Sequence, residues 1–481
     1  MAQPAAIAPA GQAIFEQSGI EPVPANARFG TASSQFRIWF GANAVVSSLF
    51  LGALGPVAFG LDFWSSLTAI AVGTVVAASA LGWASTLGPR TGMVQILFAR
   101  FTFGYRVGRV LAFFNALYCY AWSAVNLVTG TAALRLAFNL IGIPALGGSG
   151  YGTYALWVLV IAAITTAISV VGYSLVHRWE ALSTYASLVV FAILTIAVLF
   201  HTPHSGATTS TDGAYWKNWL GMALVSFGFG IGWIPYVSDY SRKLPTDTPA
   251  REVFLYGFLG LSLSVIWVES LGALISTTAP GIVAATGNSV LNGIPVIVGN
   301  NGLVVLGLLI IGLSTVSNNI PNDYTGGLSL QAAGIQVDRW LATLIGGILS
   351  ALGALFFLKS FATKFQEFLL LLAYWIGAWF VLILYDFVKR KGVYKPEDWD
   401  NPASLPRGTA PIIAFVAALG AAWIGMFPGP DVSWDRLGQG LLGKHLGVDL
   451  GFVLAIATAL LIRLLLDVVV PESSEQTTLY N

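Results

Sequence analysis

Two side chains in one long apolar stretch of this chain, Trp122 and Asn126, lie four residues apart. At helical spacing they share one face, so a flat π surface stands beside an amide. Stacking a flat heteroaromatic ring on an aromatic side chain contributes about 1–3 kcal/mol, and an amide offers a donor and an acceptor to the edge of the ring. The pair therefore suits a flat ligand that forms hydrogen bonds. In the alternative, structural role, Trp122 would fill the core or lie at a membrane interface.

A second polar group consists of three asparagines, Asn318, Asn319 and Asn322, in another apolar stretch. Asn318 and Asn322 again share a face through their spacing of four. Pro321 lies between them and has no backbone N–H, which leaves a carbonyl free to accept from a ligand. Amides that only connect membrane helices contribute about 0.6 kcal/mol per hydrogen bond. So dense a cluster therefore indicates a ligand site in preference to helix packing alone.

The composition is too apolar for a soluble fold. Of the 481 residues, 56% are hydrophobic and only 9% are charged, whereas an ordinary soluble domain is about 25% charged. The net charge of +1 gives no basic field for nucleic acid. The single cysteine, Cys119, excludes an intramolecular disulfide and a multi-cysteine metal site. We therefore expect an all-α integral membrane protein whose partner is the lipid bilayer, and we infer no obligatory protein partner.

About twelve apolar stretches are long enough to cross a bilayer as helices, which takes about 20 residues each. They lie near 37–60, 66–88, 110–138, 153–175, 181–200, 218–237, 253–278, 301–320, 341–358, 365–386, 409–428 and 448–471. Most Lys and Arg residues fall in loops on one side, which the positive-inside rule places in the cytoplasm together with both termini. We expect the cytoplasmic membrane as the location.

Gly and Pro interrupt two of these stretches. The first contains Gly41, Gly52 and Pro56, and the sixth contains glycines at 228, 230 and 232 followed by Pro235. Interruptions at corresponding places predict two inverted repeats of five helices, with a binding site at the breaks. The alternative is close helix packing through small residues.

The predicted organisation follows from these interruptions and from the spans. It comprises a cytoplasmic tail at 1–36, a core at 37–390 with repeats at about 37–200 and 218–386, a cytoplasmic loop at 391–408, two additional transmembrane helices at 409–471 and a cytoplasmic tail at 472–481.

Five short strings, in order along the chain, resemble the nucleobase-cation symporter family, and its purine-cytosine permease branch most closely. They are Gly19-Ile20-Glu21-Pro22-Val23-Pro24, Ile38-Trp39-Phe40-Gly41-Ala42-Asn43, Trp122-Ser123-Ala124-Val125-Asn126, Asp239-Tyr240-Ser241-Arg242 and Asn318-Asn319-Ile320-Pro321-Asn322. The resemblance runs from about residue 18 to 390. It implies twelve helices, ten of them in a LeuT-like inverted-repeat core, and a substrate site at the membrane midplane.

The resemblance also implies roles for individual residues. It assigns Trp122 to stacking on the substrate and the asparagines at 318–322 to contacts with a nucleobase. An aromatic residue of the interrupted sixth stretch closes the stack in the family, and we expect Trp233 here, with Gly230 or Phe229 at this position in other registers. Ser47 of the first stretch adds a hydroxyl to the base edge, unless it bonds its own backbone.

The function implied is import of a neutral nucleobase, cytosine or a purine, together with a cation. A neutral substrate fits the lack of Lys or Arg near these residues. One alternative is transport of another flat heterocycle, such as a hydantoin, allantoin or a B-group vitamin, coupled to sodium. Others are a channel and a membrane enzyme, but an enzyme needs paired carboxylates or a histidine-based site within the spans, and the sequence has neither. We expect a transporter with no cofactor beyond its coupling ion.

Our prediction of the coupling ion rests on a position where this sequence departs from the family pattern. In sodium-coupled members the ion lies between the first and eighth helices, and the matching carbonyls here are those of Gly41, Ala44 and Leu313. Two adjacent hydroxyls complete that site, but the positions here are Val316 and Ser317, and valine offers no side-chain oxygen. Sodium would regain a hydroxyl pair only if the register placed Ser314 and Thr315 in the site.

A proton is therefore the expected coupling ion, since it needs only one titratable group. Glu269, near the middle of the seventh stretch, is the candidate because an ionisable group at that depth is costly without a role. Asp62 and Asp239 lie at the ends of stretches, where we expect them to be solvated.

Overall fold

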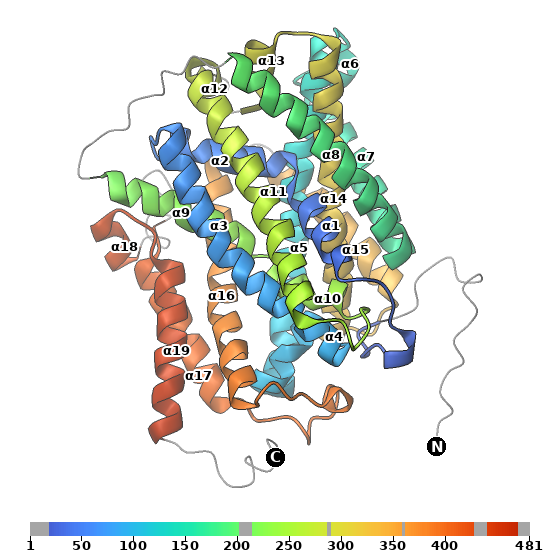
Figure 1. Cartoon of the computed structure of the whole chain (residues 1–481), viewed down its shortest axis with the longest axis vertical. Helices are drawn as coiled ribbons and strands as arrows, with labels where there is room; N and C mark the ends of the chain where they lie inside the picture. The colour runs from blue at the N-terminus through green and yellow to red at the C-terminus, as the bar shows by residue number, and fades with distance from the viewer. Residues whose placement is uncertain (1–18, 202–213, 286–289, 358–360, 428–439, 470–481) are drawn as a thin grey trace.

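The chain folds into long α-helices, most of which run along the long axis of the molecule (Figure 1). The computed structural model describes residues 19–201, 214–285, 290–357, 361–427 and 440–469. Among these residues, nine helices are long and apolar enough to cross a membrane, and a bent pair of helices forms a tenth candidate span. Helices suit this setting because lipid offers no hydrogen-bond partner to an open backbone.

Each predicted stretch coincides with a helix or a pair of helices. In order these are α1 (Ser33–Asn43) with α2 (Val46–Ala58), α3 (Phe63–Ser85), α5 (Phe98–Leu140), α7 (Tyr151–Val171), α8 (Tyr173–His201), α9 (Tyr215–Ile231), α11 (Ala250–Thr278), α14 (Gly302–Ala332), α15 (Arg339–Phe357), α16 (Phe361–Lys389), α17 (Thr409–Gly425) and α19 (Gly451–Val469). The predicted tail 472–481 and residues 1–18 of the other tail lie outside the described residues.

Short helices connect these spans. They are η1 (Ala25–Ala27), α4 (Leu87–Thr91), η2 (Gln95–Leu97), α6 (Pro144–Gly147), η3 (Ile234–Tyr236), α10 (Val237–Ser241), α12 (Pro280–Ala285), η4 (Val290–Asn292), α13 (Gly293–Val298), η6 (Pro396–Asp398) and α18 (Leu441–Leu446). In Figure 1, α6, α12 and α13 lie at one end of the molecule, and α4, α10 and the connection between α16 and α17 lie toward the other.

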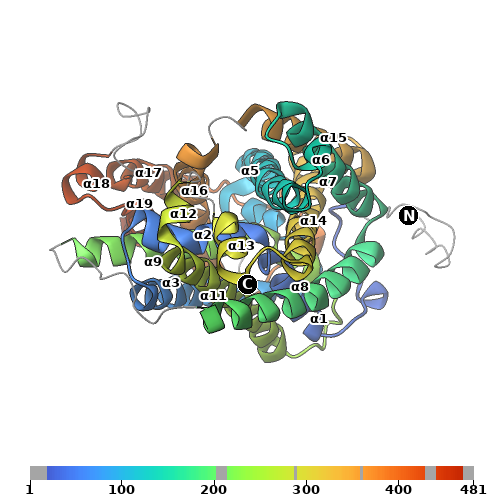
Figure 2. The same cartoon turned by 90° about the horizontal axis from the view of Figure 1, so that it is seen from above.

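Packing between the helices follows the expected inverted repeat. The second, third and fourth spans pack against the seventh, eighth and ninth, as the pairs α3 with α11, α5 with α14 and α7 with α15. The interrupted first span packs on α11, and α9 of the sixth span packs on α3, which is the corresponding contact. Helices α17 and α19 pack on each other and on α16, to one side of this core (Figure 2).

Both predicted interruptions are present, but they differ in sharpness. Between α1 and α2 the axis bends by 61°, and Val45 has extended dihedral angles there. Between α9 and α10, Gly232 and Trp233 keep right-handed dihedral angles, and a turn of 3-10 helix follows. The first span is therefore sharply broken, whereas the sixth is loosened along its length.

One helix begins earlier than the sequence predicted. The third span was expected to start near residue 110, but α5 starts at Phe98 and turns at Gly104, where φ is 80°. The basic residues of this segment made it look like a loop. Arg100 is nevertheless buried, and its guanidinium donates to the carbonyls of Trp399 (3.0 Å) and Ala332 (2.8 Å). These bonds and an ion pair with Asp400 fix the end of α5.

Candidate functional site

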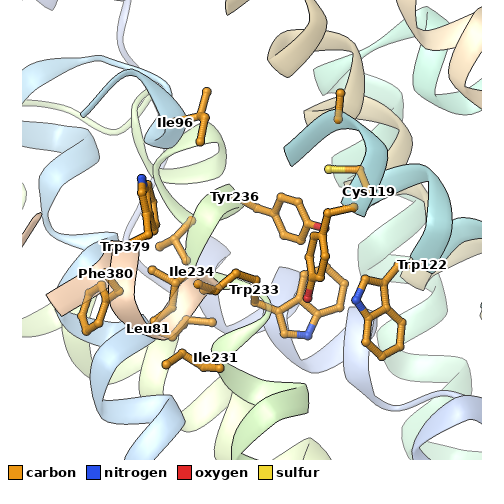
Figure 3. Close-up of a cluster of buried hydrophobic side chains, with 14 of the residues drawn as sticks. Leu81, Ile96, Cys119, Trp122, Ile231, Trp233, Ile234, Tyr236, Trp379 and Phe380 are labelled. Carbon is orange, nitrogen blue, oxygen red and sulfur yellow. The ribbon is translucent and has the colours of Figure 1, made fainter. Parts of the chain in front are cut away.

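A narrow cavity lies where α5, α14 and the loosened segment between α9 and α10 meet. It is lined by Tyr118, Trp122, Phe229, Gly232, Trp233, Tyr236, Asn318 and Asn322. In Figure 3, Trp233 and Tyr236 extend from one segment toward Trp122 on the facing helix. The cavity leaves about 10 Å³ of room for water, roughly one molecule. A flat ring therefore enters only when the aromatic walls move apart.

Aromatic rings form most of the wall. The ring centroids of Trp122 and Phe229 are 5.8 Å apart with planes inclined at 61°, and those of Tyr118 and Tyr236 are 6.2 Å apart at 31°. Trp233 packs against Tyr236 at 5.3 Å. Aromatic pairs prefer edge and offset contacts to a face-to-face stack. The site thus offers large aromatic faces from two different helices.

A side-chain hydrogen bond directly joins the interruption of the first span to that of the sixth. The indole N–H of Trp233 donates to Asn43 Oδ1 at 2.9 Å, and Asn43 Nδ2 donates to the Trp39 carbonyl at 2.7 Å. Asn43 is the last residue of α1. A movement of the first break therefore moves the indole of the sixth span.

An amide network completes the cavity and also reaches α1. Asn318 Nδ2 donates to the Ala42 carbonyl at 2.5 Å, and Asn318 Oδ1 accepts from Asn126 Nδ2. Asn322 Nδ2 donates to the Asn318 carbonyl at 3.1 Å, and Asn322 Oδ1 accepts from the Tyr236 hydroxyl at 3.1 Å. The break after Asn43 leaves the Ala42 carbonyl without its helical partner, so a side chain can use it.

Two polar atoms in this region have no hydrogen-bond partner among the described residues. They are Oδ1 of Asn126 and the indole nitrogen of Trp122, which interacts with Tyr118 but forms no hydrogen bond of normal geometry. Both side chains are buried, and a buried unpaired donor or acceptor costs about 1–3 kcal/mol. One donor and one acceptor on the same helix face match the polar edge of a heterocyclic ring.

The structure gathers some of the predicted site residues and separates others. Trp122, Trp233, Asn318 and Asn322 line the cavity, and Asn126 binds Asn318 beside it.

The other three predicted substrate residues do not line the cavity. Asn319 donates to the Ser123 carbonyl at 3.2 Å. Ser47, in the first turn of α2, is buried without a hydrogen-bond partner among the described residues. A Cβ atom on Gly230 would contact Ala77 of α3, so this glycine serves helix packing in this conformation.

Sequence reasoning did not identify three cavity residues, Tyr118, Gly232 and Tyr236. Spacing could have indicated two of them. Tyr118 lies four residues before Trp122 and Tyr236 three residues after Trp233, so each shares a helix face with a predicted residue. A Cβ atom on Gly232 would collide with the Tyr118 hydroxyl.

The two acids expected to be solvated behave differently. Asp62 caps α3 by accepting from the Ser65 backbone N–H at 2.8 Å. The prediction for Asp239 was wrong, because its side chain is buried and accepts from the Gln95 backbone N–H (2.9 Å) and the Thr325 hydroxyl (2.7 Å). The residue belongs to α10, which packs against α4 and α3 inside the protein.

The predicted cation residues fall into two places. Gly41 and Ala44 lie at the end of α1, and Ser317 on α14 accepts from the indole N–H of Trp179 at 3.0 Å. Leu313 lies on a more exposed part of the same uninterrupted helix. Glu269 lies elsewhere, against Gly52 of α2.

Glu269 is fully buried, and its Oε2 accepts from the Ser226 hydroxyl at 2.6 Å. Ser314 bonds the Ile311 carbonyl of its own helix, whereas the buried Thr315 hydroxyl has no hydrogen-bond partner in the described part of the chain. Within the same ranges, no group of three His, Cys, Asp or Glu side chains could hold a metal ion.

Apolar helices in an inverted repeat, with two interrupted spans beside an aromatic and amide cavity, define an inverted-repeat membrane transporter. The sequence matches the family described as permeases for cytosine/purines, uracil, thiamine and allantoin over residues 22–401, and the chain belongs to this family.

Two curated relatives match over most of their length. The purine-cytosine permease fcyB of Emericella nidulans is 30% identical over 475 residues, which cover 93% of this chain and 88% of the relative. The purine-cytosine permease FCY2 of Saccharomyces cerevisiae is 28% identical, in an alignment that covers 93% of this chain and 84% of the relative.

The fold has a solved counterpart. The structure of Mhp1, a nucleobase-cation-symport-1 family transporter in a closed conformation with bromovinylhydantoin bound, matches with a TM-score of 0.72 at 19% identity. The match covers 97% of this chain and 99% of that one. These findings confirm the predicted family and the predicted all-α transporter fold.

Proposed function

We propose that this chain carries a neutral nucleobase, cytosine or a purine, across the cytoplasmic membrane together with a cation. The cavity between Trp122 and Trp233 is the observation that carries the proposal. Its aromatic faces suit a flat ring, and the unpaired Trp122 N–H and Asn126 Oδ1 suit the ring's polar edge. The names of the two curated relatives, both purine-cytosine permeases, support this substrate class.

The uncharged lining of the cavity supports a neutral substrate. All eight side chains and backbone positions around the cavity are uncharged, including Asn318 and Asn322. A charged ligand would lose its hydration there and find no counter-ion in the wall, and such burial is strongly unfavourable. The lining therefore selects rings that are uncharged at neutral pH.

The interrupted helices supply the proposed route of transport. The end of α1 is bonded to the cavity twice, through Asn43 to Trp233 and through the Ala42 carbonyl to Asn318. Binding of a base between these residues changes the bonds that hold α1 in place. Rocking of the two repeats around this joint then exposes the site to one side of the membrane at a time.

We propose a proton as the coupling ion. Support comes from Val316, which takes the place of a sodium-binding hydroxyl, and from Ser317, whose hydroxyl is already bonded to Trp179. Glu269 is the carboxyl that the sequence indicates as the proton carrier. A sodium ion held by Gly41, Ala44, Leu313 and Ser317 is the alternative, and Thr315 provides an unpaired hydroxyl in its favour.

The proposed orientation places both termini in the cytoplasm. Arg242, just after α10, donates to the carbonyls of Gly19 (3.0 Å) and Glu21 (3.2 Å) and so ties the N-terminal segment to the end of the molecule near α4 and α10. The connection between α16 and α17 lies at the same end (Figure 1). Basic residues are frequent in these segments, in agreement with the positive-inside rule.

A second candidate function is transport of another flat heterocycle, such as a hydantoin, allantoin or a B-group vitamin. The family description includes thiamine and allantoin, and the aromatic walls accept many rings. The polar edge of the ring would then decide the substrate.

Uptake of labelled cytosine by cells that express this protein and lack their own base permeases tests the proposal. We expect unlabelled cytosine or adenine to compete with the label, and hydantoin, allantoin and thiamine to leave uptake unchanged. Failure of cytosine to be taken up, together with uptake of one of these three compounds when it carries the label, would favour the second candidate.

A further inference from the structure

A fully buried carboxyl on α8, Glu180, has no hydrogen-bond partner for either oxygen among the described residues. None of the ion pairs in those ranges includes it. A carboxylate buried without a partner within a membrane protein is strongly unfavourable. The group is therefore stable in this conformation only when a cation neutralises it.

The position of Glu180 is unusual because it faces the end of α1. A Cβ atom built on Gly41 would lie 2.6 Å from Glu180 Oε2 and 2.7 Å from Thr184 Oγ1. Any side chain larger than glycine at position 41 would thus displace the carboxyl. Thr184, one turn further along α8, donates to the Arg37 carbonyl at 3.0 Å. Helix α8 is therefore held closely against α1 at Glu180 and one turn beyond it.

Trp179, the residue before Glu180, connects this part of α8 to α14. The indole N–H of Trp179 donates to Ser317 Oγ at 3.0 Å. Consecutive residues of α8 thus contact Ser317 and Gly41, which are two of the predicted cation residues. Glu180 lies at the joint of α1, α8 and α14, and it supplies the negative charge that the predicted site otherwise lacks.

Charged and titratable groups on the neighbouring elements do not pair with this carboxyl. The packed helices carry Arg37 on α1, Tyr154 on α7, Glu269 on α11 and Asp323 on α14, and none of these residues bonds Glu180 within the described ranges. Asp323 accepts instead from the Ser123 hydroxyl at 2.8 Å. Tyr240 on α10 interacts with Glu180 electrostatically, but its ring cannot neutralise a carboxylate.

We propose that Glu180 binds the coupling cation, and that it does so in preference to Glu269, which has Ser226 as a partner and lies against α2. The inference rests on the proposed cation-coupled transport. The shared chemistry is a single monovalent cation, a proton or sodium, on a buried carboxylate.

The mechanism follows from three consecutive residues of α1. Gly41 contacts Glu180, the Ala42 carbonyl accepts from Asn318, and Asn43 accepts from Trp233. While the cation is bound, α8 stays packed on α1 and the base cavity keeps its shape. Release of the cation leaves a carboxylate that must reach water, so α8 and α1 separate and the bonds from Ala42 and Asn43 to the base site are lost.

The test uses purified protein in proteoliposomes and compares wild type with Glu180→Gln. The control is Glu252→Gln, the same substitution at an exposed position in the first turn of α11. Counterflow of labelled cytosine measures movement of the base without a net gradient, and accumulation under an imposed proton or sodium gradient measures coupling. We expect Glu180→Gln to retain counterflow and to lose accumulation under the gradient that drives wild type. The control should accumulate as wild type does.

The outcomes separate the two proposals. Full accumulation by Glu180→Gln, or loss of accumulation only in Glu269→Gln, would overturn the assignment of Glu180 and leave base transport intact. Absence of counterflow in wild type would instead refute the proposed function. Should Glu180→Gln not insert, Glu180→Asp keeps the charge and moves it back by one methylene. The assignment then requires a shifted cation concentration for half-maximal cytosine binding, and an unchanged value refutes it.

Discussion

Truncation of Trp122 is the perturbation that most directly probes the substrate site. Its ring lines the cavity, and its N–H is unpaired in the described structure, so the side chain has both a face and an edge to offer a base. Stacking on an aromatic side chain is worth about 1–3 kcal/mol. Trp122→Ala should therefore weaken cytosine binding by about 5- to 150-fold. Trp122→Phe keeps an aromatic face but no N–H, and its loss should be smaller.

The assay is equilibrium binding of labelled cytosine to purified protein, with thermal stability measured in the absence of base. Trp64, which is 70% exposed, provides the matched control, since Trp64→Ala removes the same side chain far from any cavity wall. Stability matters because Trp122 also contacts Phe229 and Tyr118. Normal affinity and uptake in correctly inserted Trp122→Ala protein would refute the assignment of the cavity.

Three further predictions concern the network and the driving force. Trp233→Phe leaves Asn43 Oδ1 without its donor, so thermal unfolding should show a loss of about 1–3 kcal/mol without base; no change would mean that the two interruptions are not joined. Asn126→Ala and Asn322→Ala should each weaken cytosine binding by about 1–3 kcal/mol, measured by the same binding assay, and unchanged affinity would exclude base contacts. A proton gradient, and not a sodium gradient, should drive uptake into proteoliposomes, with a single coupled charge allowing about fiftyfold accumulation per 100 mV; drive by sodium alone would refute the proton.

The sequence was informative about the substrate cavity because spacing carries that information. Trp122 and Asn126 share a helix face by virtue of their separation alone, and the glycines around Trp233 marked the loosened span. The structure confirms that these spans meet. What spacing cannot provide is the pairing of side chains across helices, such as Asn318 with the Ala42 carbonyl.

Boundaries were less well predicted, for a physical reason. Hydropathy counts a charged residue as exposed, although a buried charge with partners is allowed. Arg100 was assigned to a loop because of its charge, yet it lies inside α5 with two carbonyls and Asp400 as partners. Asp239 was assigned to solvent because it lies at the end of an apolar stretch, yet its side chain is buried.

Glu180 is a residue of proposed functional importance that hydropathy also places in a loop because of its charge. It lies one residue before the predicted fifth span and follows two basic or aromatic residues, so it was counted with a loop. The structure extends α8 back to Tyr173 and buries the carboxyl against Gly41. No hydropathy pattern distinguishes such a residue from one in a loop. The contact with a glycine of another helix becomes visible only in three dimensions.

The small volume of the cavity implies that its walls must move when a base binds as proposed. Since the walls leave room for about one water, the proposed stacking of a base between Trp122 and Trp233 requires these two rings to separate. This requires a movement of α1, because Trp233 is bonded to Asn43. In the proposed mechanism, binding of the base and movement of the broken helix are therefore parts of one event.

A structure determined with cytosine bound would test directly whether the base binds in the aromatic and amide cavity. We predict the base at the cavity between α5 and the loosened sixth span, with its ring stacked between Trp122 and Trp233 and its polar edge at Asn126 and Asn322. Cytosine bound at a position that contacts none of these four residues, or no bound cytosine at saturating concentration, would contradict it.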